Sequence, residues 1–476
     1  MKKFLIAAAL AGMSVGAEAA DLPAKAPYTK APALAAVYDW TGFYVGVNAG
    51  VGVGRDPTRL SIPGLSLEQT NLSPLGAIGG VQAGYNWQTS NWMLGLEADI
   101  QASGQHEDST CLLSCSATTN VRFDRKLEWF GTARARIGYA TGPVLTYVTG
   151  GFAYGDVKTA ITERTPVPVF GGFASPFPVA GTFTNDQIRT GYTFGSGLEA
   201  ALGGNWTGKI EYLYIDLGSR TGTYSLAGTT HTVDTRYRDN IFRAGLNYRF
   251  GSNGTTASLP VANWSGLYIG GNVGSGLGRN RSSFNADIYA EQFDLVPDGF
   301  LGGGQIGYNW QSGAWLYGVE ADFQGSTQKD NKACITLCSA GLSTSPEQKL
   351  PWLGTARGRL GYSIGSTLFY VTGGYAYGEV KTSLREFAGG AAARIDISNT
   401  KGGWTAGGGI ESPLQFFNWF GPNWTSKTEY LYVDLGRATS NFVAANTPQT
   451  FSTAVTEHIF RTGLNYHFNS PVVAKY

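Results

Sequence analysis

Apolar and polar residues alternate along many stretches of the chain, with the two-residue period of a strand that has two different faces. Leu94, Leu96 and Ala98 share one parity, and Glu97 and Asp99 occupy the other. One face of such a strand suits lipid and the other suits a polar interior. The pattern therefore predicts membrane strands rather than strands of a water-soluble sandwich.

Eight such strands are predicted in the first half of the chain. They lie near residues 42–54, 77–88, 92–102, 129–140, 144–158, 191–202, 206–217 and 241–250. Several reach the length that a tilted strand needs to cross a bilayer. Short connections alternate with long ones, and the long ones are 55–75, 103–128, 159–190 and 218–240. Short periplasmic turns and long outer loops are typical of an outer-membrane barrel, which must close because an open edge in lipid leaves backbone groups unpaired.

The second half of the chain repeats the first. GVQAGYNWQ returns as GGQIGYNWQ, WFGTARARIGY as WLGTARGRLGY, and KIEYLYIDLG as KTEYLYVDLG. The second half keeps the layout, with one longer turn around 416–422. The chain is thus a tandem duplication with sixteen predicted strands.

The N-terminus predicts export. Lys2 and Lys3 precede a short apolar run and the small-residue site that ends at Ala19, as in a cleaved secretory signal peptide. The expected organisation is a signal peptide at 1–19, a Pro/Ala-rich periplasmic lead-in at 20–39, barrel repeats at 40–250 and 264–468 joined by a linker at 251–263, and a tail at 469–476.

Composition narrows the class further. The chain has 67 Gly and only 14% charged residues, which is unusual for a water-soluble protein of this size. Without the signal peptide, 33 basic and 33 acidic residues remain, and this zero net charge argues against nucleic-acid binding. Trp87, Trp92, Trp129, Tyr139 and Trp206 lie near predicted strand ends, where aromatic girdles meet the membrane interface.

Strand parity points a balanced set of charges inward in each repeat. The first set is Glu97, Asp99, Glu199 and Glu211 with Arg134, Arg136, Lys209 and Arg243; the second is Glu320, Asp322, Glu411 and Glu429 with Arg357, Arg359, Lys427 and Arg461. An eight-stranded interior has room only for side chains, so its charges must be paired. Balance within each repeat favours two tandem eight-stranded barrels, and a single sixteen-stranded barrel is the alternative.

The opening motif W-[TS]-G-[FL]-Y and the closing motif F-R-x-G-L-N-Y-x-F occur in both repeats. With the signal peptide and the ADLP start, they resemble the small outer-membrane "porin family" barrels of alphaproteobacteria, relatives of the OmpA-type eight-stranded domain. This resemblance implies an integral outer-membrane β-barrel with a structural or surface role in the cell envelope. The chain departs from the family pattern because it has two copies of the barrel repeat and a C-terminal tail.

The closing motif is also similar to the signal by which the outer-membrane assembly machinery recognises a last strand. The matching residues are Gly245, Tyr248 and Phe250 in the first repeat and Gly463, Tyr466 and Phe468 in the second. A plain role in the aromatic girdle is the alternative for the internal copy. The tail after Phe468 leaves open which copy serves as the signal.

The four cysteines form two Cys-x-x-x-Cys pairs in the long connection after the third strand of each repeat. In an oxidising exterior, Cys111 is expected to bond to Cys115, and Cys334 to Cys338. A metal site is the weaker alternative, because each repeat offers only two thiols and no shared histidine.

No catalytic constellation is apparent. His106, His231, His458 and His467 have no histidine counterpart in the other repeat. We therefore expect neither an enzyme nor a cofactor. The expected partners are outer-membrane lipid with lipopolysaccharide, and the assembly machinery during biogenesis. A diffusion porin and a loop-borne surface binder or adhesin are the alternative functions.

Overall fold

A computed structural model of the chain describes most residues from 38 to 468. The described ranges are 38–63, 66–112, 115, 120–169, 173–226, 228–251, 261–286, 289–331, 333–335, 338, 342–388, 390–414, 420–444 and 446–468. The predicted signal peptide, the C-terminal tail, and most of the lead-in, of the linker and of the turn around 416–422 lie outside them. No helix in these ranges is long and apolar enough to cross a membrane.

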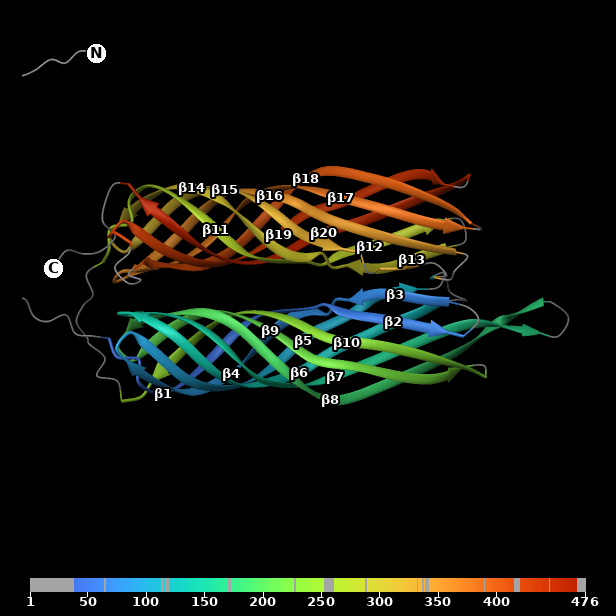
Figure 1. Cartoon of the computed structure of the whole chain (residues 1–476), viewed down its shortest axis with the longest axis horizontal. Helices are drawn as coiled ribbons and strands as arrows, with labels where there is room; N and C mark the ends of the chain where they lie inside the picture. The colour runs from blue at the N-terminus through green and yellow to red at the C-terminus, as the bar shows by residue number, and fades with distance from the viewer. Residues whose placement is uncertain are drawn as a thin grey trace, which may run out of the picture. The chain divides into compact units, whose positions relative to one another are not determined.

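The first repeat forms an antiparallel β-barrel. Its wall consists of β1 (Gly42–Gly54), β4 (Leu75–Thr89), β5 (Trp92–Leu112), β6 (Asn120–Thr141), β7 (Val144–Val169), β8 (Phe173–Gly203), β9 (Trp206–Leu226) and β10 (Thr229–Arg249) (Figure 1). β1 pairs with β4 on one side and with β10 on the other, where Tyr44 lies opposite Arg249 and Gly54 opposite Asp239. The eight strands therefore pair in a closed ring.

The second repeat has the same topology. Its wall consists of β11 (Gly266–Gly278), β14 (Asp298–Ser312), β15 (Trp315–Asp330), β16 (Leu342–Ile364), β17 (Thr367–Ala388), β18 (Ala391–Pro413), β19 (Trp424–Ala444) and β20 (Thr447–His467). β11 pairs with β14 and with β20, and Tyr268 lies opposite His467. The prediction of an all-β, antiparallel barrel fold is confirmed.

The prediction that the long connections are loops is wrong, because most of their residues form strands. The wall strands continue past the predicted ends, as in β5, which runs to Leu112, and β7, which runs to Val169. The first connection of each repeat is a hairpin, formed by β2 (Asp56–Ile62) with β3 (Ser66–Leu72) and by β12 (Asn280–Ala286) with β13 (Tyr289–Leu295). The structure thus describes twenty strands, which are the sixteen predicted wall strands and the four short strands of these two hairpins. Neighbouring backbones keep pairing where the lipid-facing pattern ends.

The predicted short turns are present at the opposite end of each barrel. Gly142 joins β6 to β7 with a φ of 60°, and Gly365 joins β16 to β17 with a φ of 58°. Glycine adopts this left-handed conformation without steric cost, so both turns close in a few residues.

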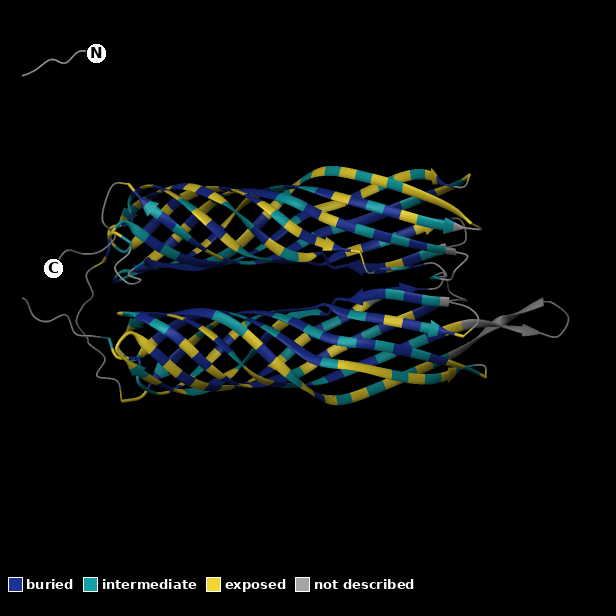
Figure 2. Cartoon of the chain, viewed as in Figure 1, coloured by how far each residue is buried: buried dark blue, intermediate teal, exposed yellow. Residues whose placement is uncertain are grey.

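The two faces of each strand differ in burial as predicted. Leu94, Leu96 and Ile100 point outward and are 57%, 56% and 48% exposed, whereas Glu97 and Asp99 between them are buried. The alternation of buried and exposed residues recurs along the barrel strands (Figure 2). The outward residues form the apolar band that a lipid-facing wall requires.

Candidate functional site

The interior of the first barrel contains a network of buried ion pairs centred on Arg134 of β6. Its guanidinium group donates hydrogen bonds to Glu97, to Asp99 Oδ2 at 2.9 Å and to Glu211 Oε1 at 3.1 Å. All four side chains have 0% exposure. One arginine therefore links carboxylates from β5 and β9.

Arg136 and Lys209 extend the network. Arg136 contacts Glu97 at 3.2 Å and Glu199 at 2.8 Å. The Lys209 ammonium lies 3.0 Å from both Glu97 carboxylate oxygens. Glu97 thus accepts from three different bases.

Arg243 of β10 closes the network across the barrel. Its guanidinium group lies 2.9 Å from Asp99 Oδ2 and also pairs with Glu211. The structure therefore brings together all eight inward charges predicted for the first repeat. Buried charges of this kind cost free energy unless each has a partner, and here each has at least one.

The second barrel reproduces the network with its own residues. Arg357 contacts Glu320, Asp322 and Glu429, the last two at 2.9 and 3.1 Å. The other contacts join Arg359 to Glu411 at 2.8 Å, Lys427 to Glu320 at 2.9 Å, and Arg461 to Asp322 at 2.8 Å. Each network is complete within one repeat.

Two interior tyrosines per repeat were missed by the sequence analysis. The Tyr44 hydroxyl donates to Glu97 Oε2 at 2.7 Å and accepts from Arg136 at 2.6 Å, and the Tyr147 hydroxyl donates to Glu211 at 2.8 Å. Tyr268 and Tyr370 occupy the matching places in the second repeat. Their recurrence in both repeats does not single them out, because the outward-facing Tyr85 recurs as Tyr308 in the same way.

Glycines make room for these tyrosines. A Cβ atom added to Gly84 would lie 2.4 Å from the Tyr44 hydroxyl, and one added to Gly307 would lie 2.3 Å from the Tyr268 hydroxyl. No side chain fits at such a separation. The repeated segment Gly-Tyr-Asn-Trp-Gln therefore carries an interior glycine that the tyrosine requires.

A buried tryptophan lies at the end of each barrel that carries the short turns. Trp40 is 0% exposed, and its indole Nε1 donates to the Gly142 carbonyl at 3.1 Å. Trp264 is also 0% exposed and donates to Ser363 Oγ at 3.1 Å. These residues begin the opening motif, and they add an apolar layer below the ion pairs.

Apolar side chains fill the interior on the other side of the ion pairs. In the first repeat this cluster includes Phe130, Leu213 and Ile241, and in the second it includes Leu353, Leu431 and Ile459. Each interior thus contains an indole layer, an ionic layer and an apolar layer.

Aromatic residues lie on the outer wall near the short turns, as predicted. Trp87, Trp92 and Trp206 are 49%, 51% and 46% exposed. Trp92 contacts Tyr139 edge to face, with ring centroids 5.5 Å apart. Trp129 is near the other end of the wall and contacts Tyr154 at 5.9 Å. These positions match two interfacial girdles.

The proposed assembly-signal residues lie at the short-turn end of the closing strands. Phe250 and Phe468 are 46% and 48% exposed, and each ring contacts the tyrosine two residues earlier at 5.2 Å. These positions fit both an assembly signal and a girdle, so the assembly role stays a prediction.

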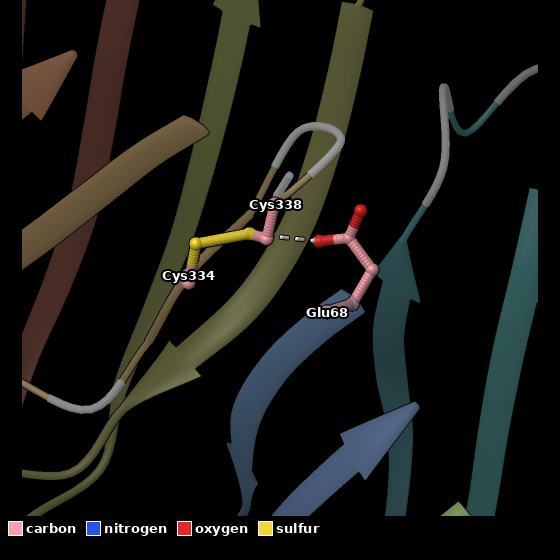
Figure 3. Close-up of a disulfide and its surroundings, with 3 residues drawn as sticks. All are labelled: Glu68, Cys334 and Cys338. Carbon is pink, nitrogen blue, oxygen red and sulfur yellow. Dashed lines mark hydrogen bonds between the residues drawn. A yellow bond between two sulfur atoms is a disulfide. The ribbon is translucent and has the colours of Figure 1, made fainter. Parts of the chain in front are cut away.

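Cys111 is bonded to Cys115 and Cys334 to Cys338, which is the pairing that the sequence predicts. Cys338 Sγ lies 3.5 Å from Glu68 Oε2 of the first repeat (Figure 3). A disulfide sulfur carries no hydrogen, so this contact is packing rather than a hydrogen bond donated by sulfur.

Mass spectrometry of non-reduced peptides from the purified protein is expected to show these two links. A three-residue spacer closes within one segment, so neither bond needs the other repeat. The same digest after reduction is the control. Free thiols in native protein, or a link between Cys111 and Cys338, would contradict the pairing.

Equivalent residues of the two repeats also make reciprocal contacts. Arg55 Nε donates to the Val296 carbonyl at 3.0 Å, and Arg279 Nε donates to the Ser73 carbonyl at 2.6 Å. Arg279 further pairs with Glu107 at 3.1 Å. Both arginines directly follow the first wall strand of their repeat, so the same position serves both partners.

In the part of the chain that the structure describes, no group of three or more His, Cys, Asp or Glu side chains is arranged to hold a metal ion. His231 Nδ1 lies 2.7 Å from Glu163, and His458 Nδ1 lies 2.7 Å from the Tyr430 hydroxyl. These histidines occupy different positions in the two repeats. The expectation that the chain is not an enzyme stays a prediction.

Comparison with known proteins is consistent with this architecture. The family described as "Outer membrane protein beta-barrel domain" matches residues 5–250 and again residues 254–468. The 31 kDa outer-membrane immunogenic protein of Brucella melitensis is 37% identical over 259 residues, which span 52% of this chain and 100% of that protein. The 25 kDa outer-membrane immunogenic protein of the same organism is 30% identical over 247 residues, which span 52% of this chain and 96% of that protein.

Among solved structures, the attachment invasion locus protein Ail of Yersinia pestis is 14% identical. The match covers 41% of this chain and 97% of Ail, with a TM-score of 0.17.

Proposed function

Because the chain belongs to the outer membrane protein β-barrel family, we propose that it is a closed structural protein of the outer membrane, built as two small barrels that conduct no solutes. Its relatives are named outer-membrane proteins, and the chain is an outer-membrane protein as they are. The proposal concerns what the barrels do there.

The filled interior carries this proposal. The side chains of Glu97, Arg134 and Lys209 are 0% exposed, as are those of Arg357 and Lys427 in the second repeat. Eight strands enclose a space that side chains fill, whereas sixteen strands leave an aqueous channel. Charges lining a water-filled lumen would be hydrated and exposed. The pairing of β1 with β10 and of β11 with β20 supports two such filled barrels.

A diffusion porin is the main alternative, and single-channel recording separates the two. Full-length protein added to planar lipid bilayers is expected to give no steady conductance, because the indole, ionic and apolar layers fill each lumen. A known sixteen-stranded porin, reconstituted in parallel, controls for insertion. Large, stable channels from the full chain would reject the closed-barrel proposal and favour a single wide barrel.

A surface role accompanies the structural one in this proposal. The relatives are named immunogenic outer-membrane proteins, which supports exposure of this chain on the cell surface. The strand extensions and hairpins at the end opposite the short turns supply that surface. A surface binder or adhesin stays the second alternative, which deletion of the β2–β3 hairpin would test.

The proposed partners are outer-membrane lipid with lipopolysaccharide, and the assembly machinery during biogenesis. We also propose that the chain has no catalytic activity, needs no cofactor and binds no nucleic acid, since the mature charge is balanced.

A further inference from the structure

The outer end of the first repeat carries a cavity of about 310 Å³ between β2, β3, β9 and β10. Arg59, Arg220 and Arg236 line it, together with a single acidic residue, Asp234. The remaining lining is mostly hydroxyl and amide side chains, including Gln69. The cavity therefore has an excess of positive charge and neutral polar groups around it.

The side chains of two of these arginines have no partner among the residues that the structure describes. Arg236 pairs with Asp216 at 2.6 Å, and Asp234 accepts a hydrogen bond from the Thr221 hydroxyl. The side chains of Arg59 and Arg220 form no ion pair and no hydrogen bond with a described residue, and both residues are exposed. Two guanidinium groups thus remain available to an external anion.

The cavity begins where the outer aromatic girdle ends. The Tyr192 and Tyr214 hydroxyls lie 3.5 and 3.4 Å from Asp216 Oδ2, which in turn accepts from Arg236 Nε at 2.9 Å. Tyrosines of a girdle sit at the level of the headgroups. Arg236 therefore joins the girdle to the cavity, and the cavity opens just outside the lipid-facing band.

We propose that this cavity binds a phosphate-bearing sugar of the outer-leaflet lipopolysaccharide. Guanidinium groups bind phosphate oxygens through paired, charge-assisted hydrogen bonds. The hydroxyl and amide groups suit the hydroxyls of a sugar ring. The inference rests on the proposed location in the outer membrane, which puts such a phosphosugar at the height of the cavity.

The second repeat does not carry these three arginines. Its residues equivalent to Arg59, Arg220 and Arg236 are Ser283, Ala438 and Ala454. The strand pairing gives this match: Arg59 lies opposite Asp234 and Arg220 opposite Thr235 in the first repeat, as Ser283 lies opposite Ser452 and Ala438 opposite Thr453 in the second. The chain is thus expected to bind one lipopolysaccharide molecule per protein at this type of site, rather than two.

The test measures binding of purified lipopolysaccharide to the full chain refolded in detergent. The double variant Arg59→Gln/Arg220→Gln is expected to lose about tenfold or more in affinity, because it removes the two free guanidinium groups. Added salt is expected to weaken wild-type binding, since the contact is electrostatic and exposed. Lipopolysaccharide stripped of its phosphates is expected to bind the wild-type protein no more tightly than it binds the double variant.

The matched control is Arg281→Gln/Arg437→Gln, which removes two exposed arginines from the equivalent strands of the second repeat. This control should bind like the wild type. An equal loss in both double variants, or full binding of dephosphorylated lipopolysaccharide, would overturn the site. Equally tight binding of free glucosamine phosphate would overturn the lipid as the source of the ligand. Heat-modifiable migration of each variant reports folding separately, so a failure of this site is distinguishable from a failure of the barrel assignment.

Discussion

Replacing Glu97 by alanine is expected to destabilise the folded protein by about 3–5 kcal/mol, the cost of leaving buried charges without their partner. Glu97 lies within 3.0 Å of Lys209 and 3.2 Å of Arg136, and it also accepts from Arg134. Its removal leaves four buried bases facing three acids inside the first barrel. Urea titration of the fast-migrating folded band in detergent measures the effect.

The control is Glu128→Ala. Glu128 pairs with Lys158 at 2.9 Å, but both side chains are more than one-third exposed, so the loss of stability should be much smaller than for Glu97→Ala. Glu320→Ala in the second repeat should behave like Glu97→Ala, because it makes the matching contacts. Adding Lys209→Met to Glu97→Ala should restore part of the stability by correcting the imbalance. If Glu97→Ala and Glu128→Ala lost equal stability, the buried network would not hold the barrel.

The first repeat alone, expressed as residues 20–250, is expected to fold in detergent and to give its own heat-modifiable band. β1 pairs with both β4 and β10, so the fragment has no open edge. Eight strands cut from one large barrel would expose two edges, and each unpaired backbone group in lipid costs several kcal/mol. Gel migration with and without boiling, together with circular dichroism, measures the outcome.

A shorter fragment, residues 20–228, supplies the control because it lacks the closing strand β10. Without β10, β1 and β9 each have an open edge, and without Arg243 the ion network loses a base. This fragment should aggregate while the longer one folds. Aggregation of both fragments, with folding of the full chain only, would favour a single barrel that needs all its strands.

The sequence predicted the membrane wall because two environments impose a strict period on it. Leu94 must face lipid and Glu97 must not, so parity alone assigned both faces correctly. The outer strand extensions were not predictable in this way. Beyond the lipid both faces meet water or protein, so the period weakens although backbone pairing continues to Val169 in β7.

The candidate site was predictable where only one environment could hold the residue. A charged residue such as Arg134 has no place on a lipid-facing wall, so its parity was decisive. Tyrosine suits both an interfacial girdle and a polar interior, because it has an apolar ring and a polar hydroxyl. Tyr44, which is buried, and Tyr85, which is 38% exposed, therefore look alike in the sequence. The partner of β1 was likewise undecidable, because β10 and β20 end in nearly the same sequence.

The strand pairing that closes each ring also makes assembly a competition between correct and incorrect strand pairs. β10 and β20 end in nearly the same sequence, and β1 and β11 offer similar backbone partners. During insertion, β1 can meet β10 before the second repeat is complete, and an early closure removes both strands from competition. If β1 is still unpaired when β20 is inserted, β1 can pair with β20 instead. Such misassembly between similar units is a characteristic failure of repeat proteins. The yield of correctly folded protein should therefore depend on how fast β1 pairs with β10 relative to the insertion of the second repeat, and not only on the stability of the finished fold.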